Sequence, residues 1–282
     1  MYRDLLITTD GSDVATTAAG YGLAIANRVD ATAHVVSVVE AGHDASLESV
    51  PSSARREADR AVESIVADAE EIGVTTRSTV LAGRPGHRLL TYADEREIDL
   101  IACGTTGRTG MRRLLVGSVA TEIIRGARQP VLSVGPAVAT VGSSFDSILV
   151  ATDGRPGVDD AVDHAISFAE TYDATLHALY VVDETRPHLQ VIRDEFQRIG
   201  EESTTTIDER ASAVGVETVR AIEAGVPAET IVEYANRIDS DLIVVGTESR
   251  AGLERFVIGS VSQHVVHDAG RPVLTVRSVD SG

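Results

Sequence analysis

Two loops of the sequence carry small residues at a spacing that suits the binding of a phosphate group. The first loop reads G-x2-G-x9-G-S and consists of Gly104, Gly107, Gly117 and Ser118. Glycines let backbone N–H groups approach an anion closely, and free amides at the start of a helix favour negative charge. The alternative is a glycine-rich turn that binds nothing. This is not the lysine-bearing phosphate loop, because the chain contains no lysine.

The second loop belongs to an internal duplication of the chain. Residues 82–134 align without a gap on residues 224–276, and 21 of these 53 pairs are identical. The starts of the halves also match, with LLITTDGS at residues 5–12 and ILVATDGR at residues 148–155. We therefore predict one domain over residues 1–135, a linker over 136–144 that contains Gly and Pro, and a second domain over 145–282.

Short apolar, β-branched runs alternate with longer segments of helical spacing in each half. Runs such as DLIVVG at 241–246 are apolar on both faces, as in parallel strands covered by helices on both sides. The predicted fold is α/β, with two doubly wound, parallel five-stranded sheets in tandem, each in the order 3-2-1-4-5. The strands are expected near residues 4–9, 32–39, 74–81, 99–103 and 130–134, and near 146–151, 174–182, 216–222, 241–245 and 272–276. Helices are expected near 13–28, 52–72, 86–96 and 117–127.

This strand order brings distant motifs together. Open parallel sheets bind ligands at the carboxyl ends of their strands, where the chain order reverses, which here is between strands 1 and 4. Asp10 follows strand 1 and Gly104 begins the loop after strand 4. We therefore expect both to line one cleft, and Asp153 and Gly246 to do the same in the second half.

The first-turn aspartate, combined with G-x2-G-x9-G-S, resembles the universal stress protein family in its tandem form, over practically the entire chain. The resemblance implies that the chain binds ATP or AMP, with the loop holding the phosphates, the aspartate contacting the nucleoside and a strand 2 residue contacting adenine. In the first half it implies Asp10, Val38, Gly104, Gly107, Gly117, Ser118 and Val119. In the second half it implies Asp153, Val181, Gly246, Gly259, Ser260 and Val261.

The second half departs from the family pattern at two positions. Ser249 replaces the second glycine, and a Cβ there penalises positive φ by roughly 1 kcal/mol, although its hydroxyl could instead donate to a phosphate. Arg155 stands where the first half has Ser12, and it could face the anion or point into solvent. The first site is therefore expected to be the better formed.

Turnover of the nucleotide is expected to be slow or absent, because the chain has no phosphate-loop lysine and no obvious base. Asp10 and Asp153 could hold a divalent ion such as Mg²⁺ through water, or bind ribose. Cys103 ends a buried strand and suits packing better than nucleophilic work. The pair His264 and His267 lacks a third metal ligand nearby in the sequence. Two hypotheses remain: a nucleotide-binding regulatory protein, or an interaction scaffold that binds no nucleotide, especially through its second half.

The charge of the chain argues against some partners. With 43 acidic and 25 basic residues, all of the latter arginine, the formal net charge is -18. Nucleic acid and anionic membranes would be repelled. Acidic proteins without lysine are expected in a halophile, here a haloarchaeon, although a GC-rich genome would also disfavour lysine codons. The N-terminal sequence has no export leader, so we expect a cytoplasmic protein.

The last strand of each half, residues 130–134 and 272–276, is an edge strand in the predicted order, and exposed edges invite pairing. In the family this strand pairs between protomers. The resemblance therefore implies an intramolecular pseudo-dimer of the two halves, and two such chains could associate further.

Overall fold

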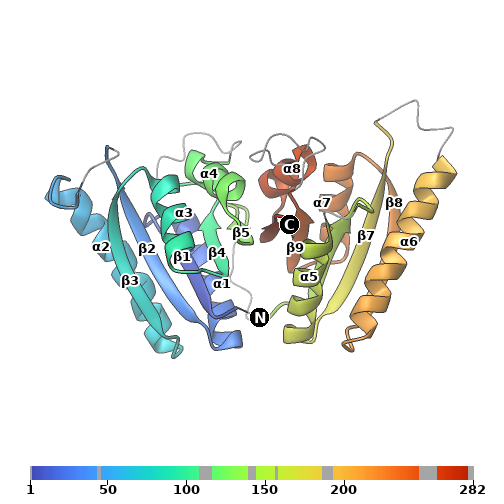
Figure 1. Ribbon diagram of the computed structural model, residues 1–282, viewed down its shortest axis with the longest axis horizontal. Coiled ribbons are helices and arrows are strands. Elements are labelled where there is room, and N and C mark those ends of the chain that lie inside the picture. Colours follow the sequence, from blue (N-terminus) through green and yellow to red (C-terminus); the bar gives the residue numbers. More distant parts are fainter. Residues whose placement is uncertain are drawn as a thin grey trace. The chain divides into compact units, whose positions relative to one another are not determined.

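A computed structural model of the protein describes residues 2–42, 46–107, 116–138, 144–155, 158–185, 193–247 and 259–278. The chain divides into two compact units, Met1–Val141 and Gly142–Gly282. Each unit is an α/β domain with one parallel sheet, as Figure 1 shows.

The first unit has five strands that pair in the order β3-β2-β1-β4-β5, all parallel. This confirms the predicted order 3-2-1-4-5. The strands are β1 (Asp4–Thr8), β2 (Thr32–Glu40), β3 (Thr76–Gly83), β4 (Leu100–Gly104) and β5 (Val131–Val134).

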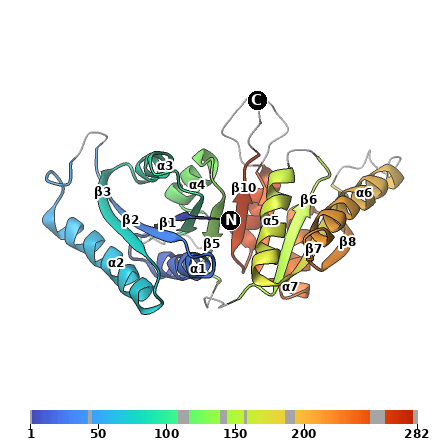
Figure 2. The same ribbon diagram turned by 60° about the horizontal axis from the view of Figure 1, so that its bottom comes forward.

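Helices cover both faces of this sheet (Figure 2). On one face α1 packs on β1 and β4 while α2 packs on β2 and β3, and on the other face α3 and α4 pack against each other. The helices are α1 (Asp13–Val29), α2 (Ser52–Glu71), α3 (Pro85–Glu95) and α4 (Ser118–Gly126).

The second unit repeats this architecture, with parallel strands in the order β10-β9-β6-β7-β8. The strands are β6 (Ser147–Thr152), β7 (Thr175–Asp183), β8 (Thr218–Gly225), β9 (Leu242–Gly246) and β10 (Val273–Val276). The helices are α5 (Asp159–Tyr172), α6 (Arg193–Ser212), α7 (Pro227–Arg237) and α8 (Ser260–Asp268).

The core forms because the central strands are apolar on both faces. Leu5, Leu6 and Ile7 of β1 are completely buried, which fits a parallel sheet between two helical layers. Gly22 lets α1 approach closely, since a Cβ at this position would lie 2.9 Å from Cγ1 of Ile7 and 3.1 Å from Cβ of Ala102. The first helix is therefore fixed over β1 and β4, the two strands that flank the predicted cleft.

Two predicted strands begin later than expected. The strand predicted over 74–81 starts at Thr76, and the one predicted over 216–222 starts at Thr218. The N–H groups of Val74 and Val216 still donate to carbonyl oxygens of the preceding helices, those of Ala69 and Ala211. These valines therefore complete the ends of α2 and α6, and the strands begin after them.

Four acidic residues adopt left-handed backbone conformations after helices. Asp30 (φ 55°), Glu97 (φ 49°), Asp173 (φ 56°) and Asp239 (φ 52°) follow the ends of α1, α3, α5 and α7. Glycine is the usual residue at such positions, and aspartate is tolerated better than most other residues. The duplication thus places a carboxylate at corresponding helix ends in both units.

Candidate functional site

The turn after β1 holds Asp10 at the carboxyl edge of the first sheet. The N–H group and the hydroxyl of Ser12 both donate to Oδ1 of Asp10, at 3.0 and 2.6 Å. The same Ser12 hydroxyl accepts from the N–H of Ala15 and so caps α1. Gly11 makes the turn possible with a φ of +79°, and its N–H donates to Oγ1 of Thr9. The carboxylate is therefore fixed by the start of the helix.

The glycine loop after β4 reaches this carboxylate. A Cβ at Gly107 would lie only 2.7 Å from Oδ2 of Asp10, closer than real Cβ contacts allow. At Gly104 a Cβ would lie 3.0 Å from the backbone nitrogen of Ala15. A Cβ at either position would therefore require its neighbour to shift, the Asp10 carboxylate in one case and the backbone of α1 in the other. The predicted convergence of the two motifs at one edge of the sheet is confirmed.

The start of α4 lies at the same edge. The N–H of Thr105 donates to the carbonyl of Val134 at 2.9 Å, and the N–H of Gly117 donates to the carbonyl of Thr105 at 2.6 Å. Ser118 is exposed and Val119 is half-buried. No described side chain caps the start of α4, and first-turn amides without partners favour an anion. Residues 108–115 of the loop lie outside the described residues.

Val38 lies beyond the end of β1 on the neighbouring strand. Thr8, the last residue of β1, pairs with Val36, whereas Val38 pairs with Leu81 of β3. Val38 is half-buried. An apolar side chain thus stands beside the predicted cleft, on the side of β1 away from the glycine loop.

The second unit differs at the first turn. The N–H of Arg155 donates to Oδ1 of Asp153 at 3.2 Å, and its Nε lies 3.5 Å from Oδ2. The two side chains are 52% and 55% exposed, so the ion pair is weak. The guanidinium group of Arg155 nevertheless takes the place that the Ser12 hydroxyl has in the first unit, beside the first-turn aspartate.

A buried tyrosine also distinguishes the first turn of the second unit. Tyr180 of β7 pairs with Thr152 of β6 and is 4% exposed. A Cβ at Gly154 would lie 3.6 Å from its ring. Burial raises the pKa of Tyr180, Asp153 raises it further, and Arg155 opposes them. Ser37 occupies the corresponding position of the first unit, an exchange that the sequence analysis did not identify.

At the start of α8 the second unit repeats a backbone hydrogen bond of the first and adds one from a side chain, because Ser262 stands where the first unit has Ala120. The N–H of Gly259 donates to the carbonyl of Thr247 at 3.3 Å, and the hydroxyl of Ser262 donates to the carbonyl of Gly246 at 2.5 Å. Ser260 is exposed, whereas Val181 and Val261 are half-buried. Ser249 lies outside the described residues.

The family comparison agrees with the duplicated fold. The sequence profile of the universal stress protein family matches residues 1–135 and again residues 144–277. The chain belongs to the universal stress protein family. Its tandem organisation follows from the two consecutive matches, which together cover nearly the whole chain.

Individual universal stress proteins resemble one unit or both. A universal stress protein of Methanocaldococcus jannaschii is 36% identical over 140 residues, 48% of this chain and 82% of the relative. One of Mycolicibacterium smegmatis is 27% identical over 241 residues, 82% of this chain and 79% of the relative. A crystal structure of a universal stress protein from Archaeoglobus fulgidus has a TM-score of 0.77 at 20% identity and covers 98% of each chain. That structure is similar in fold.

Cysteine and histidine side chains that could have had a chemical role in this universal stress protein are buried or contact neighbouring groups of the chain. Cys103 is buried, which raises the pKa of its thiol to about 12. His264 lies with its Nδ1 2.6 Å from the Ser260 carbonyl, and His267 contacts the neighbouring Asp268. Within the described parts of the chain, no three His, Cys, Asp or Glu side chains are grouped as a metal site. No helix in those parts has the length and hydropathy to cross a membrane.

Proposed function

We propose that this universal stress protein binds an adenine nucleotide, ATP or AMP, in the first-unit cleft between β1 and β4, and acts as a regulatory protein of the stress response. The observation that carries the proposal is the approach of Gly107 to Asp10, with the start of α4 at the same edge. A phosphate there would meet backbone amides, and a carboxylate beside it suits ribose hydroxyls.

The cleft suits binding better than hydrolysis. The N–H groups of Ser118 and Val119 at the start of α4 would hold the phosphates, Asp10 the ribose, and Val38 the adenine, while Gly104, Gly107 and Gly117 leave room for the nucleotide. The N–H groups of Thr105 and Gly117 already donate to carbonyl oxygens of the chain. Asp10 already accepts two hydrogen bonds from Ser12 through Oδ1, which opposes its use as a general base. We therefore expect slow or no turnover. A Mg²⁺ ion bound with the nucleotide is part of the proposal, through water to Asp10.

Replacing Gly107 with alanine tests the first-unit site. The new Cβ would lie 2.7 Å from Oδ2 of Asp10 and would displace the carboxylate. We expect the affinity for labelled ATP to fall by about tenfold or more, because a lost charge-assisted hydrogen bond is worth about 1.5 kcal/mol or more. Equilibrium dialysis of the full chain measures this. Gly42→Ala is the matched control, because a Cβ at Gly42 meets nothing within 4 Å.

The circular dichroism spectrum of each variant shows whether it remains folded. Equal ATP affinity for the folded Gly107→Ala variant and the wild-type chain would remove this cleft from the proposal. Loss of affinity in Gly42→Ala as well would mean that the measurement reports general damage.

A second candidate function, an interaction scaffold without nucleotide, is favoured for the second unit by Ser249, which stands where the loop of the first unit has its second glycine. The counterparts of the first-unit residues are Asp153, Val181, Gly246, Ser249, Gly259, Ser260 and Val261. We expect dialysis at saturating ATP to give one nucleotide per chain. Two per chain would show that the second cleft also binds.

Other parts of the proposal concern assembly and location. We infer that the two units form a pseudo-dimer through residues 130–134 and 272–276. We also infer that two such chains associate with each other. The protein is expected in the cytoplasm of a haloarchaeon. Light scattering at several salt concentrations measures the association. Neither nucleic acid nor a membrane is expected as a partner, because the net charge is -18.

A further inference from the structure

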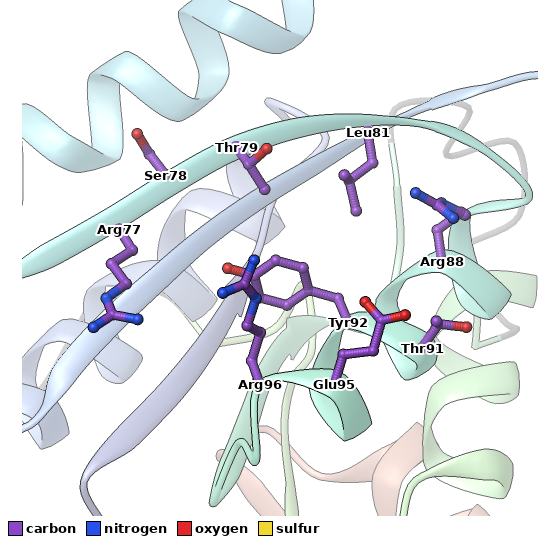
Figure 3. Close-up of a pocket in the computed structure, with 9 residues that line it drawn as sticks. All are labelled: Arg77, Ser78, Thr79, Leu81, Arg88, Thr91, Tyr92, Glu95 and Arg96. Carbon is purple, nitrogen blue, oxygen red and sulfur yellow. The ribbon is translucent and has the colours of Figure 1, made fainter. Parts of the chain in front are cut away.

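A pocket of about 360 Å³ lies between β3 and α3 of the first unit, separate from the cleft between β1 and β4. Three arginines line it: Arg77 from β3, Arg88 from α3, and Arg96 directly after α3. Figure 3 shows Arg77 and Arg96 towards the hydroxyl end of Tyr92, and Arg88 towards the other end. We call this the arginine pocket.

The guanidinium groups of the arginine pocket are not neutralised by described parts of the chain. Nε of Arg88 is buried and has no hydrogen-bond partner among the described residues. The stem of Arg88 passes over Gly83, where a Cβ would lie 3.0 Å from its Cγ. Arg96 lies with its Cζ 5.7 Å from the ring centre of Tyr92. Because Nε of Arg88 is itself covered, a ligand in the pocket would interact with the guanidinium charge of Arg88 and not with this N–H group.

Tyr92 forms a fixed wall of the pocket. Its hydroxyl lies 2.9 Å from Nδ1 of His34, and Nε2 of His34 lies 2.9 Å from Oδ1 of Asp4. His34 is 1% exposed, so the chain of contacts runs into the core. The tyrosine ring therefore keeps its place whether or not the pocket is filled.

The charge of the pocket is opposite to that of the protein. Three arginines and one carboxylate, that of Glu95, line it, which gives a formal charge of 3 - 1 = +2. The whole chain carries -18. Glu95 disfavours an anion at its own side of the pocket, but the arginines retain an excess of positive charge.

The second unit has the same scaffold without these cations. Tyr234 corresponds to Tyr92, and its hydroxyl lies 3.3 Å from Nδ1 of His177. Arg237, at the position of Glu95, pairs with Glu223 of β8 and lies over the Tyr234 ring. Here the chain supplies both the cation and its counter-ion. At the three arginine positions the second unit has Val219, Thr230 and Ile238.

We propose that the arginine pocket binds a small molecule through a phosphate group. Guanidinium groups match phosphate geometry with paired N–H donors. A phosphate monoester offers three terminal oxygens, which suits several guanidinium groups better than the two oxygens of a carboxylate. The volume is within the usual range for small-molecule sites, about 300–1,000 Å³. The site does not depend on nucleotide binding in the cleft.

Chemical modification of arginine tests this proposal residue by residue. Phenylglyoxal reacts with guanidinium groups, and peptide mass spectrometry reports the rate at each position of the full chain. We expect inorganic phosphate to slow the modification of Arg77, Arg88 and Arg96, with the same half-saturating phosphate concentration for all three. Chloride keeps the ionic strength constant throughout. Arg56 of α2, which is exposed, should react at an unchanged rate. No protection, or equal protection of Arg56, would overturn the proposal.

A variant that imports the residues of the second unit provides the second test. Arg77→Val/Arg88→Thr/Arg96→Ile uses side chains that the same fold already accommodates, so we expect it to fold. Phosphorus NMR relaxation of inorganic phosphate should give an affinity lowered about tenfold or more relative to Arg56→Gln, which removes one positive charge elsewhere. Equal affinity of the folded triple variant and Arg56→Gln would contradict the assignment of the pocket.

Discussion

Replacing Gly200 with alanine perturbs the contact between α6 and β7 in the second unit. A Cβ at Gly200 would lie 2.7 Å from Cδ1 and 3.0 Å from Cγ of Tyr180. The first unit shows how this space can be filled differently, because Ser37 stands at the strand position and Ala58 at the helix position. In the second unit the large Tyr180 of β7 thus faces Gly200 of α6, and in the first unit the small Ser37 of β2 is accompanied by Ala58 of α2.

Two opposing effects set the size of the change. Alanine in a helix interior is more favourable than glycine by about 1 kcal/mol. Overpacking of a core costs roughly 1–3 kcal/mol, and the tyrosine is too buried to move away. We therefore expect Gly200→Ala to lower the free energy of unfolding by about 1 kcal/mol. In the Tyr180→Ser background the clash is absent, so the same substitution should raise it by about 1 kcal/mol.

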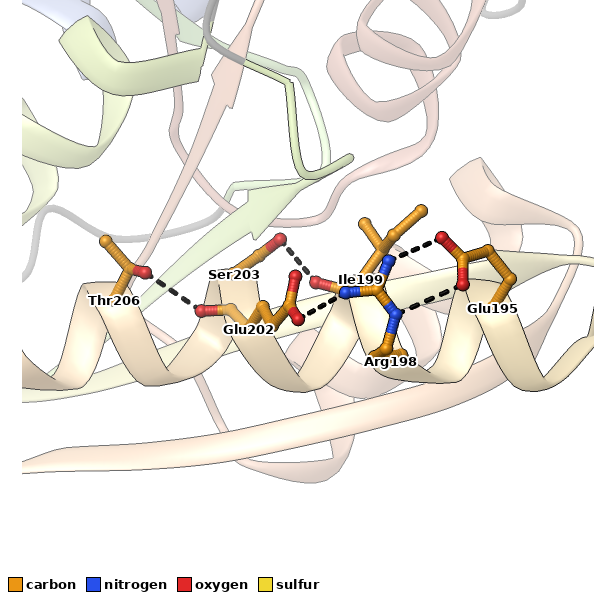
Figure 4. A network of polar contacts seen from close by, with 6 residues as sticks. All are labelled: Glu195, Arg198, Ile199, Glu202, Ser203 and Thr206. Atoms are coloured by element: carbon orange, nitrogen blue, oxygen red, sulfur yellow. Dashed lines mark hydrogen bonds and ion pairs between the residues drawn. The ribbon is translucent and has the colours of Figure 1, made fainter.

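Urea unfolding followed by far-ultraviolet circular dichroism measures the four variants of this double-mutant cycle. The solvent side of α6 is the same in all of them: Arg198 lies between Glu195 and Glu202, as Figure 4 shows. The decisive result is the reversal of sign between backgrounds. If Gly200→Ala stabilises both backgrounds equally, the helix does not press on the tyrosine and our account of this interface is wrong.

Two further predictions concern titratable groups. Burial raises the pKa of Cys103 to about 12, so roughly one thiol in ten thousand is ionised at pH 8 and Cys103 should resist iodoacetamide in the native state. Mass spectrometry should detect alkylation only after urea is added. Rapid labelling of the native protein would contradict the burial of Cys103. Burial lowers the pKa of His164 and His177 below 6.5, so the unfolded chain binds protons more readily and the free energy of unfolding should fall as the pH drops below about 7 towards the lowered pKa values. Urea midpoints of His164→Gln/His177→Gln should depend less on pH than those of His87→Gln, and an equal dependence would rule out these two groups as its source.

Much of the fold was predictable from the sequence, because burial between two helical layers demands apolar strands. Leu5, Leu6 and Ile7 show this pattern and lie in the core. The convergence of Asp10 and Gly107 also followed from the strand order, since parallel strands present their carboxyl ends at one edge. Strand limits were less accurate where a helix end takes up the next residue, as at Val74.

Features that depend on side-chain packing were not predictable in the same way. The exchange of Ser37 for Tyr180 is visible in the sequence only once the register of β2 and β7 is known. Arg77, Arg88 and Arg96 are spread over 20 positions and look like separate surface charges until β3 and α3 bring them together. One signal in the sequence could have indicated the pocket: the second half has Val219, Thr230 and Ile238 at the positions of these three arginines.

The left-handed carboxylates of Asp30, Glu97, Asp173 and Asp239 also have a consequence for behaviour in dilute solution. Each puts negative charge beside the negative end of a helix dipole, an unfavourable arrangement that dissolved ions weaken, although Arg271 partly compensates Asp239 with Nη2 2.6 Å from Oδ1. These helix ends lead into β2, β4, β7 and β9, at the edge of each sheet opposite the carboxyl ends of the strands. As ions are removed, each unit should loosen first at that distant edge, and the edge at the carboxyl ends of the strands should be the last region to lose its shape.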